Sequence, residues 1–381
     1  MPVVDFAQFH YFPALQTGFA EVLAYAQLAA AMKQRLVPIF ELSQRDTAAN
    51  FDEPIAEVRN ATSGLSFLLD LSKDPAPAPY RYANEDAAKV ARDTAAQTQY
   101  NNLLATLLSP QDGFAAWRSL VASFPNAIPV LQFREPAVEA RQILRQAALL
   151  SHGDMSLAIR IAPDHADALS ALVPQILSIL RSPSQLLIIA DCGQRRQQLS
   201  QRAQFAADTI TRILAGTDIS EQALVRAVCM SSWYSKPDQQ GVHIYPSQDW
   251  ALWREARETF PFAFGDYGAM HRQRRANTYI PGDFVATVTI PLDEGWHAYR
   301  HPNANERLGW RTGSEMLRDA GALAGAPACW GRDLVTRAAT GDLTGSDRVR
   351  IWHASRVNLH LTKQIELAQQ NVTQYESDDD E

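Results

Sequence analysis

Four acidic residues stand at the ends of short apolar runs and are well placed to do chemistry: Glu41, Asp70, Asp191 and Asp266. Carboxylates from different strands that meet at one point can hold Mg²⁺ or Mn²⁺, or can act as a general acid and base. Alternatively, each carboxylate only caps the rim of the barrel by accepting hydrogen bonds from backbone N–H groups or from a neighbouring arginine. We expect all four to be catalytic residues in one pocket, with Glu41, Asp70 and Asp266 as metal ligands.

Two arginines, Arg134 and Arg160, lie in consecutive apolar runs of the same kind. A guanidinium beside the acids suits a phosphate or carboxylate group of a substrate. A plain arginine–aspartate bridge across the fold is the alternative. Trp233, at the end of a later run, either stacks on a substrate or fills the rim. We take Arg134, Arg160 and Trp233 as substrate-binding candidates.

Eight apolar runs alternate with helical stretches along the first 270 residues. Each run is too short for a helix and ends in polar residues, which is typical of buried strands. Eight such units predict an α/β fold, a (β/α)8 TIM-like barrel whose reactive groups lie at the carboxyl ends of the strands. The predicted strands are 10–16, 37–43, 65–72, 128–135, 157–162, 186–193, 224–234 and 262–268.

Strand faces alternate with a period of two, so the residues two and four positions before an inward carboxylate also point inward. Apolar layers are therefore expected beneath three of the acids: Val37 and Ile39 beneath Glu41, Leu68 beneath Asp70, and Leu187 and Ile189 beneath Asp191.

From residue 271 the pattern changes, and we expect three parts: the barrel (1–270), a C-terminal α+β extension (271–370) and an acidic disordered tail (371–381). In the extension, 284–290 alternates like an antiparallel strand and is expected to form a hairpin with 296–300, followed by helices at 314–323 and 348–370. In the barrel, the first helix is expected at 19–35. The segments 73–80, rich in proline, and 235–245 are expected to be long loops on the active face.

The composition is that of an ordinary globular protein: 46% of residues are hydrophobic and the net charge is −7. This charge disfavours a protein that coats nucleic acid, although the basic segment 271–275 leaves a local contact open. Cys192, Cys229 and Cys329 form no C-x-x-C pair, and neither a secretory signal nor an apolar run of about 18 residues occurs. We expect a cytoplasmic protein with no membrane contact.

No phosphate-binding P-loop, dinucleotide fingerprint, serine-hydrolase elbow or His-Glu-x-x-His motif is present. Acids together with arginines instead predict a divalent-metal-dependent hydrolase that uses Mg²⁺ or Mn²⁺ on an anionic substrate, a phosphoester or nucleotide. The alternative is a non-catalytic barrel scaffold that binds a protein or nucleic-acid partner.

Short motifs carry a family resemblance: Tyr11-x-Pro13-x-Leu15, then Glu21, Pro38-Ile39-Phe40-Glu41 and Gly265-Asp266-Tyr267-Gly268. In this order they resemble the beta protein family of phages and bacteria, which we associate with a phage T4 protein. The resemblance implies a barrel-like core, a setting in phage defence or mobile elements, and importance for Tyr11, Glu41, Asp70 and Asp266. It adds Tyr11 and Tyr267 to the substrate-binding candidates.

Overall fold

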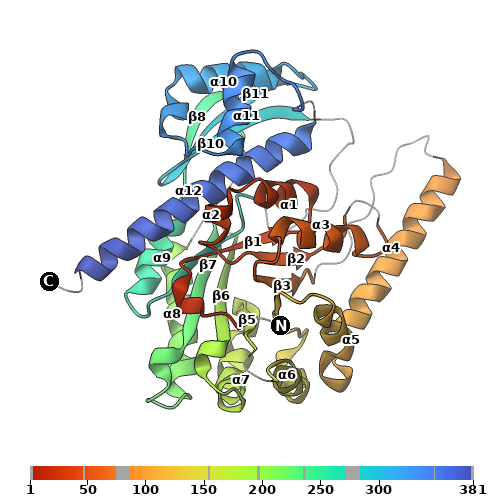
Figure 1. The fold of residues 1–381 in the computed structure, drawn as a ribbon, viewed down its shortest axis with the longest axis vertical. Coiled ribbons are helices and arrows are strands. Elements are labelled where there is room, and N and C mark those ends of the chain that lie inside the picture. Colours follow the sequence, from red (N-terminus) through yellow and green to blue (C-terminus); the bar gives the residue numbers. More distant parts are fainter. Residues whose placement is uncertain are drawn as a thin grey trace.

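Eight parallel strands form the centre of the computed structural model, which describes residues 3–45, 48–73, 86–152, 155–194, 198–234, 237–270, 284–346 and 348–378 (Figure 1). The strands are β1 (Tyr11–Gln16), β2 (Ile39–Leu42), β3 (Phe67–Leu71), β4 (Ala127–Pro129), β5 (Leu157–Ile161), β6 (Leu186–Gln194), β7 (Arg226–Ser232) and β9 (Ala263–Asp266). All eight correspond to predicted strands. The predicted run 128–135 is shortened most, because β4 ends at Pro129.

Strand order shows that this sheet closes into a barrel. The strands are hydrogen-bonded in the order β4-β3-β2-β1-β9-β7-β6-β5. A parallel bridge between Val130, directly after β4, and Ala158 of β5 brings the two outer strands together. The predicted (β/α)8 barrel is therefore confirmed, and the carboxyl ends of all eight strands meet at one rim.

Alternate residues of the strands fill the cylinder. The apolar layers expected beneath the acids are confirmed, because Val37, Ile39, Leu68, Leu187 and Ile189 all belong to one buried inner cluster. Their neighbours along the chain, such as Phe40 and Ile188, belong instead to the larger cluster between strands and helices. This division follows from the two-residue period of a strand.

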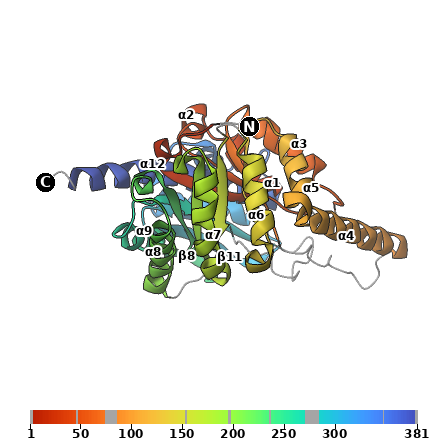
Figure 2. The same cartoon turned by 90° about the horizontal axis from the view of Figure 1, so that it is seen from below.

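Helices cover the outside of the cylinder (Figure 2). Those of the barrel region are α1 (Phe19–Ala26), α2 (Ala30–Lys33), α3 (Asp52–Thr62), α4 (Ala87–Leu107), α5 (Gln111–Ala122), α6 (Pro136–Leu150), α7 (Ala166–Ile179), α8 (Leu199–Ala215) and α9 (Asp249–Arg257). The single helix expected at 19–35 is two helices, because the backbone of Ala29 is non-helical (φ −58°, ψ 146°).

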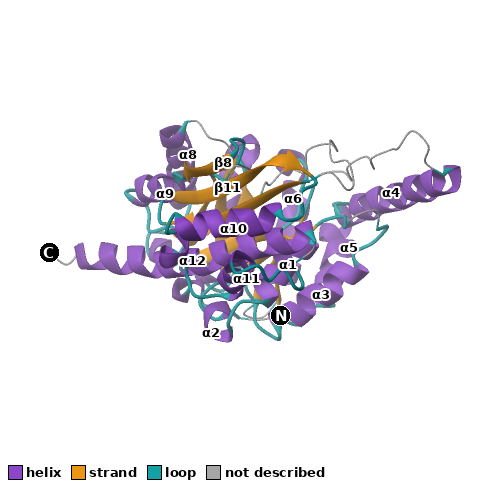
Figure 3. Ribbon diagram, turned by 90° about the horizontal axis from the view of Figure 1, so that it is seen from above, coloured by secondary structure: helices purple, strands orange, loops and turns teal. Residues whose placement is uncertain are grey.

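A small antiparallel sheet lies beside the barrel (Figures 1 and 3). It contains β8 (Gly241–Pro246), β10 (Val285–Leu292) and β11 (Gly295–Ala304) in the order β10-β11-β8. The predicted hairpin is β10 and β11 and is confirmed. The loop expected at 235–245 is wrong over its second half, because residues 241–246 pair with β11, some fifty residues further along the chain. Helices α10 (Gly309–Asp319) and α11 (Trp330–Ala339) accompany this sheet; α11 was not predicted.

The last helix, α12 (Val349–Asp378), returns to the barrel. It runs between the small sheet and the barrel (Figure 1), and its buried residues Val357, Leu361 and Ile365 belong to the hydrophobic cluster outside the barrel strands. It therefore acts as the outer helix that follows β9, although we expected it in a separate extension. The helix continues beyond 370 into the segment expected to be disordered; residues 379–381 lie outside the described part.

Two predicted features, the basic segment 271–275 and residues 74–80 of the proline-rich loop, also lie outside the described residues. In the described ranges, no helix combines the length and apolar character needed to cross a bilayer.

Close packing inside the barrel makes Gly265 sensitive to substitution. A Cβ atom added there would lie 2.7 Å from Cγ1 of Val228 and 3.1 Å from the backbone oxygen of Phe12. We predict that Gly265→Ala lowers the free energy of unfolding by about 1–3 kcal/mol, the usual cost of overpacking. Urea denaturation measures this. Gly325→Ala is the control, since nothing lies within 4 Å of a Cβ there; equal effects of the two changes would contradict the packing described.

Candidate active site

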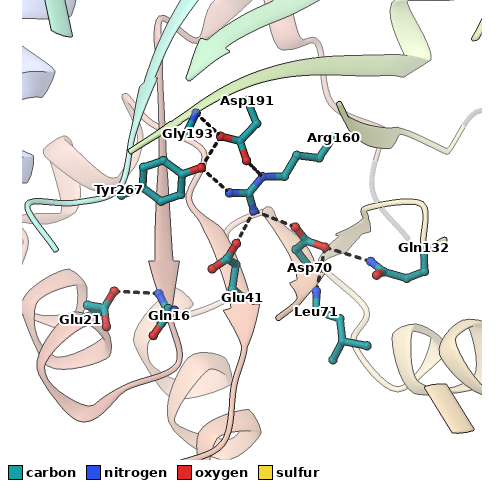
Figure 4. Close-up of polar contacts among 10 residues, drawn as sticks. All are labelled: Gln16, Glu21, Glu41, Asp70, Leu71, Gln132, Arg160, Asp191, Gly193 and Tyr267. Carbon is teal, nitrogen blue, oxygen red and sulfur yellow. Dashed lines mark hydrogen bonds and ion pairs between the residues drawn. The ribbon is translucent and has the colours of Figure 1, made fainter. Parts of the chain in front are cut away.

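Arg160 occupies the centre of the barrel mouth and contacts side chains from several other strands (Figure 4). Its Nε donates to Oδ2 of Asp191 at 2.9 Å. Its Nη1 donates to Oδ2 of Asp70 at 3.1 Å and also to Oε1 of Glu41. Its Nη2 donates to the hydroxyl oxygen of Tyr267 at 2.9 Å. We call Arg160, Glu41, Asp70, Asp191 and Tyr267 the mouth cluster.

Strand register explains why these five residues meet. Glu41 and Asp70 are direct partners in the β2–β3 pairing. Arg160 is paired with Ile189, which places Asp191 two residues further along β6 on the same face. Tyr267 directly follows β9. All lie above the apolar layers of the inner cluster, so barrel closure gathers them at the carboxyl-terminal rim.

The mouth cluster is a buried ionic network. The side chains of Arg160 and the three carboxylates are each 9% exposed or less. Burial alone would lower the pKa of the Arg160 guanidinium, but Tyr267 and the three carboxylates hold this pKa well above its ordinary value. The arginine therefore stays charged, and its bonds are charge-assisted.

The three carboxylates differ in how far the protein saturates them. Asp70 Oδ1 accepts from the Leu71 amide at 2.8 Å and from Gln132 Nε2 at 3.0 Å. Asp191 Oδ1 accepts from the Gly193 amide at 2.9 Å and from the Tyr267 hydroxyl. Glu41 binds Arg160 through Oε1, and Figure 4 marks no contact from its other carboxylate oxygen to the residues drawn. Glu41 is thus the carboxylate with an oxygen available to a ligand.

A cavity of about 260 Å³ opens above the cluster. Its described lining is Glu41, Asp70, Leu71, Ser72, Lys73, Val130, Leu131, Phe133, Arg160, Ala162, Asp164, His165 and Asp191. Four of these residues are acids and two, Lys73 and Arg160, are cationic side chains, so in the described lining the acids outnumber these cations by two. The cavity therefore favours a ligand that brings positive charge.

Asp266 does not join the mouth cluster, although we expected the four acids in one pocket. It faces the opposite side of β9, where its Oδ1 accepts from the Tyr11 hydroxyl at 2.9 Å and from the Gly268 amide at 2.8 Å. Its Oδ2 lies 2.6 Å from Nε2 of His360 on α12. Inward and outward residues alternate, so Tyr267 enters the mouth and its neighbours face away.

Burial raises the pKa of Tyr11 well above its ordinary value, and the adjacent Asp266 carboxylate raises it further. The hydroxyl therefore remains a proton donor to this carboxylate. His360 in turn stacks on Trp296 of β11, with ring centroids 4.9 Å apart. Tyr11 and Asp266 thus link the barrel to α12 and the small sheet, rather than to the mouth cavity.

We expected three metal ligands to lie together: Glu41, Asp70 and Asp266. They are separated, because Asp266 faces away from the barrel interior while the other two face into the mouth. In the part of the chain that the structure describes, no group of three or more histidine, cysteine or acidic residues has an arrangement that could hold a metal ion. The proposed ligand set is therefore wrong in its geometry. Arg160 uses its Nε and both Nη atoms within the protein, so it is also not an open fork for an anion.

The remaining substrate-binding candidates lie outside the cavity lining. Arg134 is exposed, and its backbone amide donates to Glu139 Oε2 at 2.7 Å at the start of α6. The backbone amide of Trp233 donates at 3.1 Å to Asp249, a half-buried residue that joins the end of β7 to α9. We did not predict Gln132 or His360 from the sequence. Gln132 could have been found, because it continues the alternating inward series 128, 130 and 132. His360 could not, because no local pattern marks it.

Fold and mouth cluster together define a (β/α)8 barrel protein with a polar site at the carboxyl-terminal rim. The chain belongs to the Beta protein family, which it matches over residues 11–366. Among curated proteins it is similar to "Protein beta" of Enterobacteria phage P4, with 27% identity over 387 residues, covering 99% of this chain and 98% of the relative. The phage is P4, not T4, the source we had associated with the family.

The outward network of Asp266 predicts a structural effect for Tyr11. We expect Tyr11→Phe to lower the free energy of unfolding by about 1.5–3 kcal/mol, because it removes a hydrogen bond to a buried carboxylate. Thermal or urea unfolding measures this.

Tyr25→Phe is the matched control, since the Tyr25 hydroxyl is buried and has no hydrogen-bond partner among the described residues. Its removal should be neutral or stabilising. A Tyr11→Phe variant as stable as Tyr25→Phe would contradict the network.

Proposed function

We propose that this protein is a barrel enzyme whose active site is the mouth cavity, with Glu41 as general acid–base acting on a substrate that brings positive charge to the site. The observation that carries the proposal is the mouth cluster: three carboxylates are gathered around one guanidinium, and in the described cavity lining acids outnumber cationic side chains by two.

Position supports an enzymatic role. In barrels of this type, the groups that react with substrate lie at the carboxyl ends of the strands. The mouth cluster occupies that rim, whereas the apolar layers below it fill the interior of the barrel. Burying an ionic network also costs desolvation free energy, so the network is weak evidence for a stabilising role. A site that holds reactive groups in a fixed position explains it better.

The division of labour within the cluster supports Glu41 as the proton-transfer group. Asp70 and Asp191 each accept backbone and side-chain hydrogen bonds besides the arginine, so they position Arg160. Arg160 holds one oxygen of Glu41 and leaves the other toward the cavity. A carboxylate fixed in this way can take a proton from a bound substrate and return it.

The positive charge has two sources with the same electrostatic effect. One is an ammonium or guanidinium group of the substrate itself. The other is a divalent cation that enters together with an anionic phosphoester, as in the hydrolase expected from the sequence. In the second case the ion is held by fewer protein ligands than expected, since Asp266 is absent from the cavity, and the substrate supplies the rest.

Thermal shift with wild type and Glu41→Gln tests the proposal. The probes are putrescine, MgCl₂ and MnCl₂, the last two with and without p-nitrophenyl phosphate. A cation that binds should stabilise wild type by about 2.7 kcal/mol at a hundredfold excess over Kd. Glu41→Gln should lose most of this stabilisation. Glu315→Gln should keep it, because Glu315 is a half-buried acid paired with Arg311 on α10, away from the mouth.

The probes separate the two sources of charge. Stabilisation by putrescine indicates an amine substrate, whereas stabilisation by a metal with release of nitrophenol, lowered about 100-fold or more by Glu41→Gln, indicates assisted hydrolysis. If no cation shifts the melting temperature of wild type, the proposal fails and a scaffold that binds a macromolecular partner is favoured.

A further inference from the structure

A second cavity, of about 200 Å³, lies at the opposite end of the barrel. It is formed by the N-terminal segment before β1 and by residues around the starts of β6, β7 and β9. Its described lining is Phe6, Ala7, Phe9, His10, Phe12, Leu187, Val225, Arg226, Ala227, Arg257, Pro261, Phe262 and Ala263. The mouth cavity shares none of these residues, so the two sites are separate.

The charge of this amino-end cavity is opposite to that of the mouth. Arg226 and Arg257 contribute two permanent positive charges, His10 adds a titratable ring, and none of the described lining residues is acidic. The amino end therefore attracts an anion, whereas the carboxyl end attracts a cation.

Arg226 is the group best prepared to bind that anion. Its Nη1 donates to the backbone oxygens of Ala223 and Val225, at 2.8 and 3.1 Å. These bonds fix the guanidinium, but neither oxygen carries a full charge. Its Nε is buried without a hydrogen-bond acceptor, and no described carboxylate forms an ion pair with it. Its Nη2 forms no hydrogen bond or ion pair with a described residue, so this nitrogen can donate to a ligand in the cavity.

The rest of the lining is apolar and aromatic. Phe6, Phe12 and Phe262 are buried, and Phe9 packs partly buried against the inner cluster. A hydrated inorganic ion would gain nothing from these walls. An aromatic ring would cover the exposed surface of Phe9 and Pro261 and can stack on Phe9. The cavity is also smaller than most ligand pockets, which limits the ligand to about one ring with its charged group.

We infer that the amino-end cavity binds a small aromatic carboxylate, with the carboxylate accepting from Arg226 and the ring against Phe9 and Pro261. A planar guanidinium matches the two oxygens of a carboxylate. Bound there, the ligand joins the N-terminal segment to the start of β7, so it stabilises the closed end of the barrel independently of the mouth.

Calorimetric titration with benzoate tests this inference, with benzamide as a neutral probe of the same shape and inorganic phosphate as an anion without a ring. Benzoate should bind wild type at least about tenfold more tightly than either, since charge and ring both contribute. Failure of benzoate to bind, or equal binding of benzamide or phosphate, would overturn the inference.

Arg226→Gln should weaken benzoate binding about tenfold or more. Arg254→Gln is the matched control, because Arg254 lies on α9 like Arg257 but is exposed and paired with Glu294; it should bind as wild type does. If Arg226→Gln fails to fold by circular dichroism, Arg226→Lys replaces it, because it keeps the charge and loses the planar fork. Benzoate affinity equal to wild type in the folded Arg226 variant would overturn the inference.

Discussion

One buried arginine with three carboxylates around it sets the main constraint on this barrel. Charges that leave water lose hydration free energy, and only close pairing with complete hydrogen bonding compensates the loss. Arg160 reaches its partners from β5, while they lie on β2, β3 and β6. In the strand order, β5 lies at one end of the sheet and β2 and β3 lie near the other end, and the bridge from Val130 to Ala158 closes the seam between these ends. An open sheet would leave these charges apart, so the ionic contacts and the closure of the cylinder require each other.

A second buried carboxylate, on the other face of β9, ties the end of the chain to the barrel. Asp266 joins Tyr11 of β1 to His360 of α12, and His360 stacks on Trp296 of the small sheet. Strands β10 and β11 and helices α10 and α11 are thus inserted between the last barrel strand and its covering helix, whereas β8 comes from the connection between β7 and α9. The same strand end serves two purposes, since Tyr267 enters the mouth while Asp266 anchors α12.

The barrel and most of the mouth cluster could be predicted from the sequence, because both follow from local patterns. Apolar runs ending in polar residues gave the eight strands, and the two-residue period placed Glu41, Asp70 and Asp191 above apolar layers. The same two-residue period places Tyr267 inside the barrel and Asp266 outside it. An acid at a strand end, however, suggests a site residue whichever face it lies on. β8 and His360 depend on partners distant in sequence, which local pattern does not contain.

The energetic coupling between Arg160 and Glu41 tests the central claim most directly. Urea unfolding of wild type, Arg160→Met, Glu41→Gln and the double variant gives a double-mutant cycle. If the arginine holds this carboxylate, Arg160→Met alone is costly, by about 3–5 kcal/mol, because it leaves buried charges unpaired. The two changes should then be non-additive by about 1–3 kcal/mol. Additivity within about 0.5 kcal/mol would contradict the account.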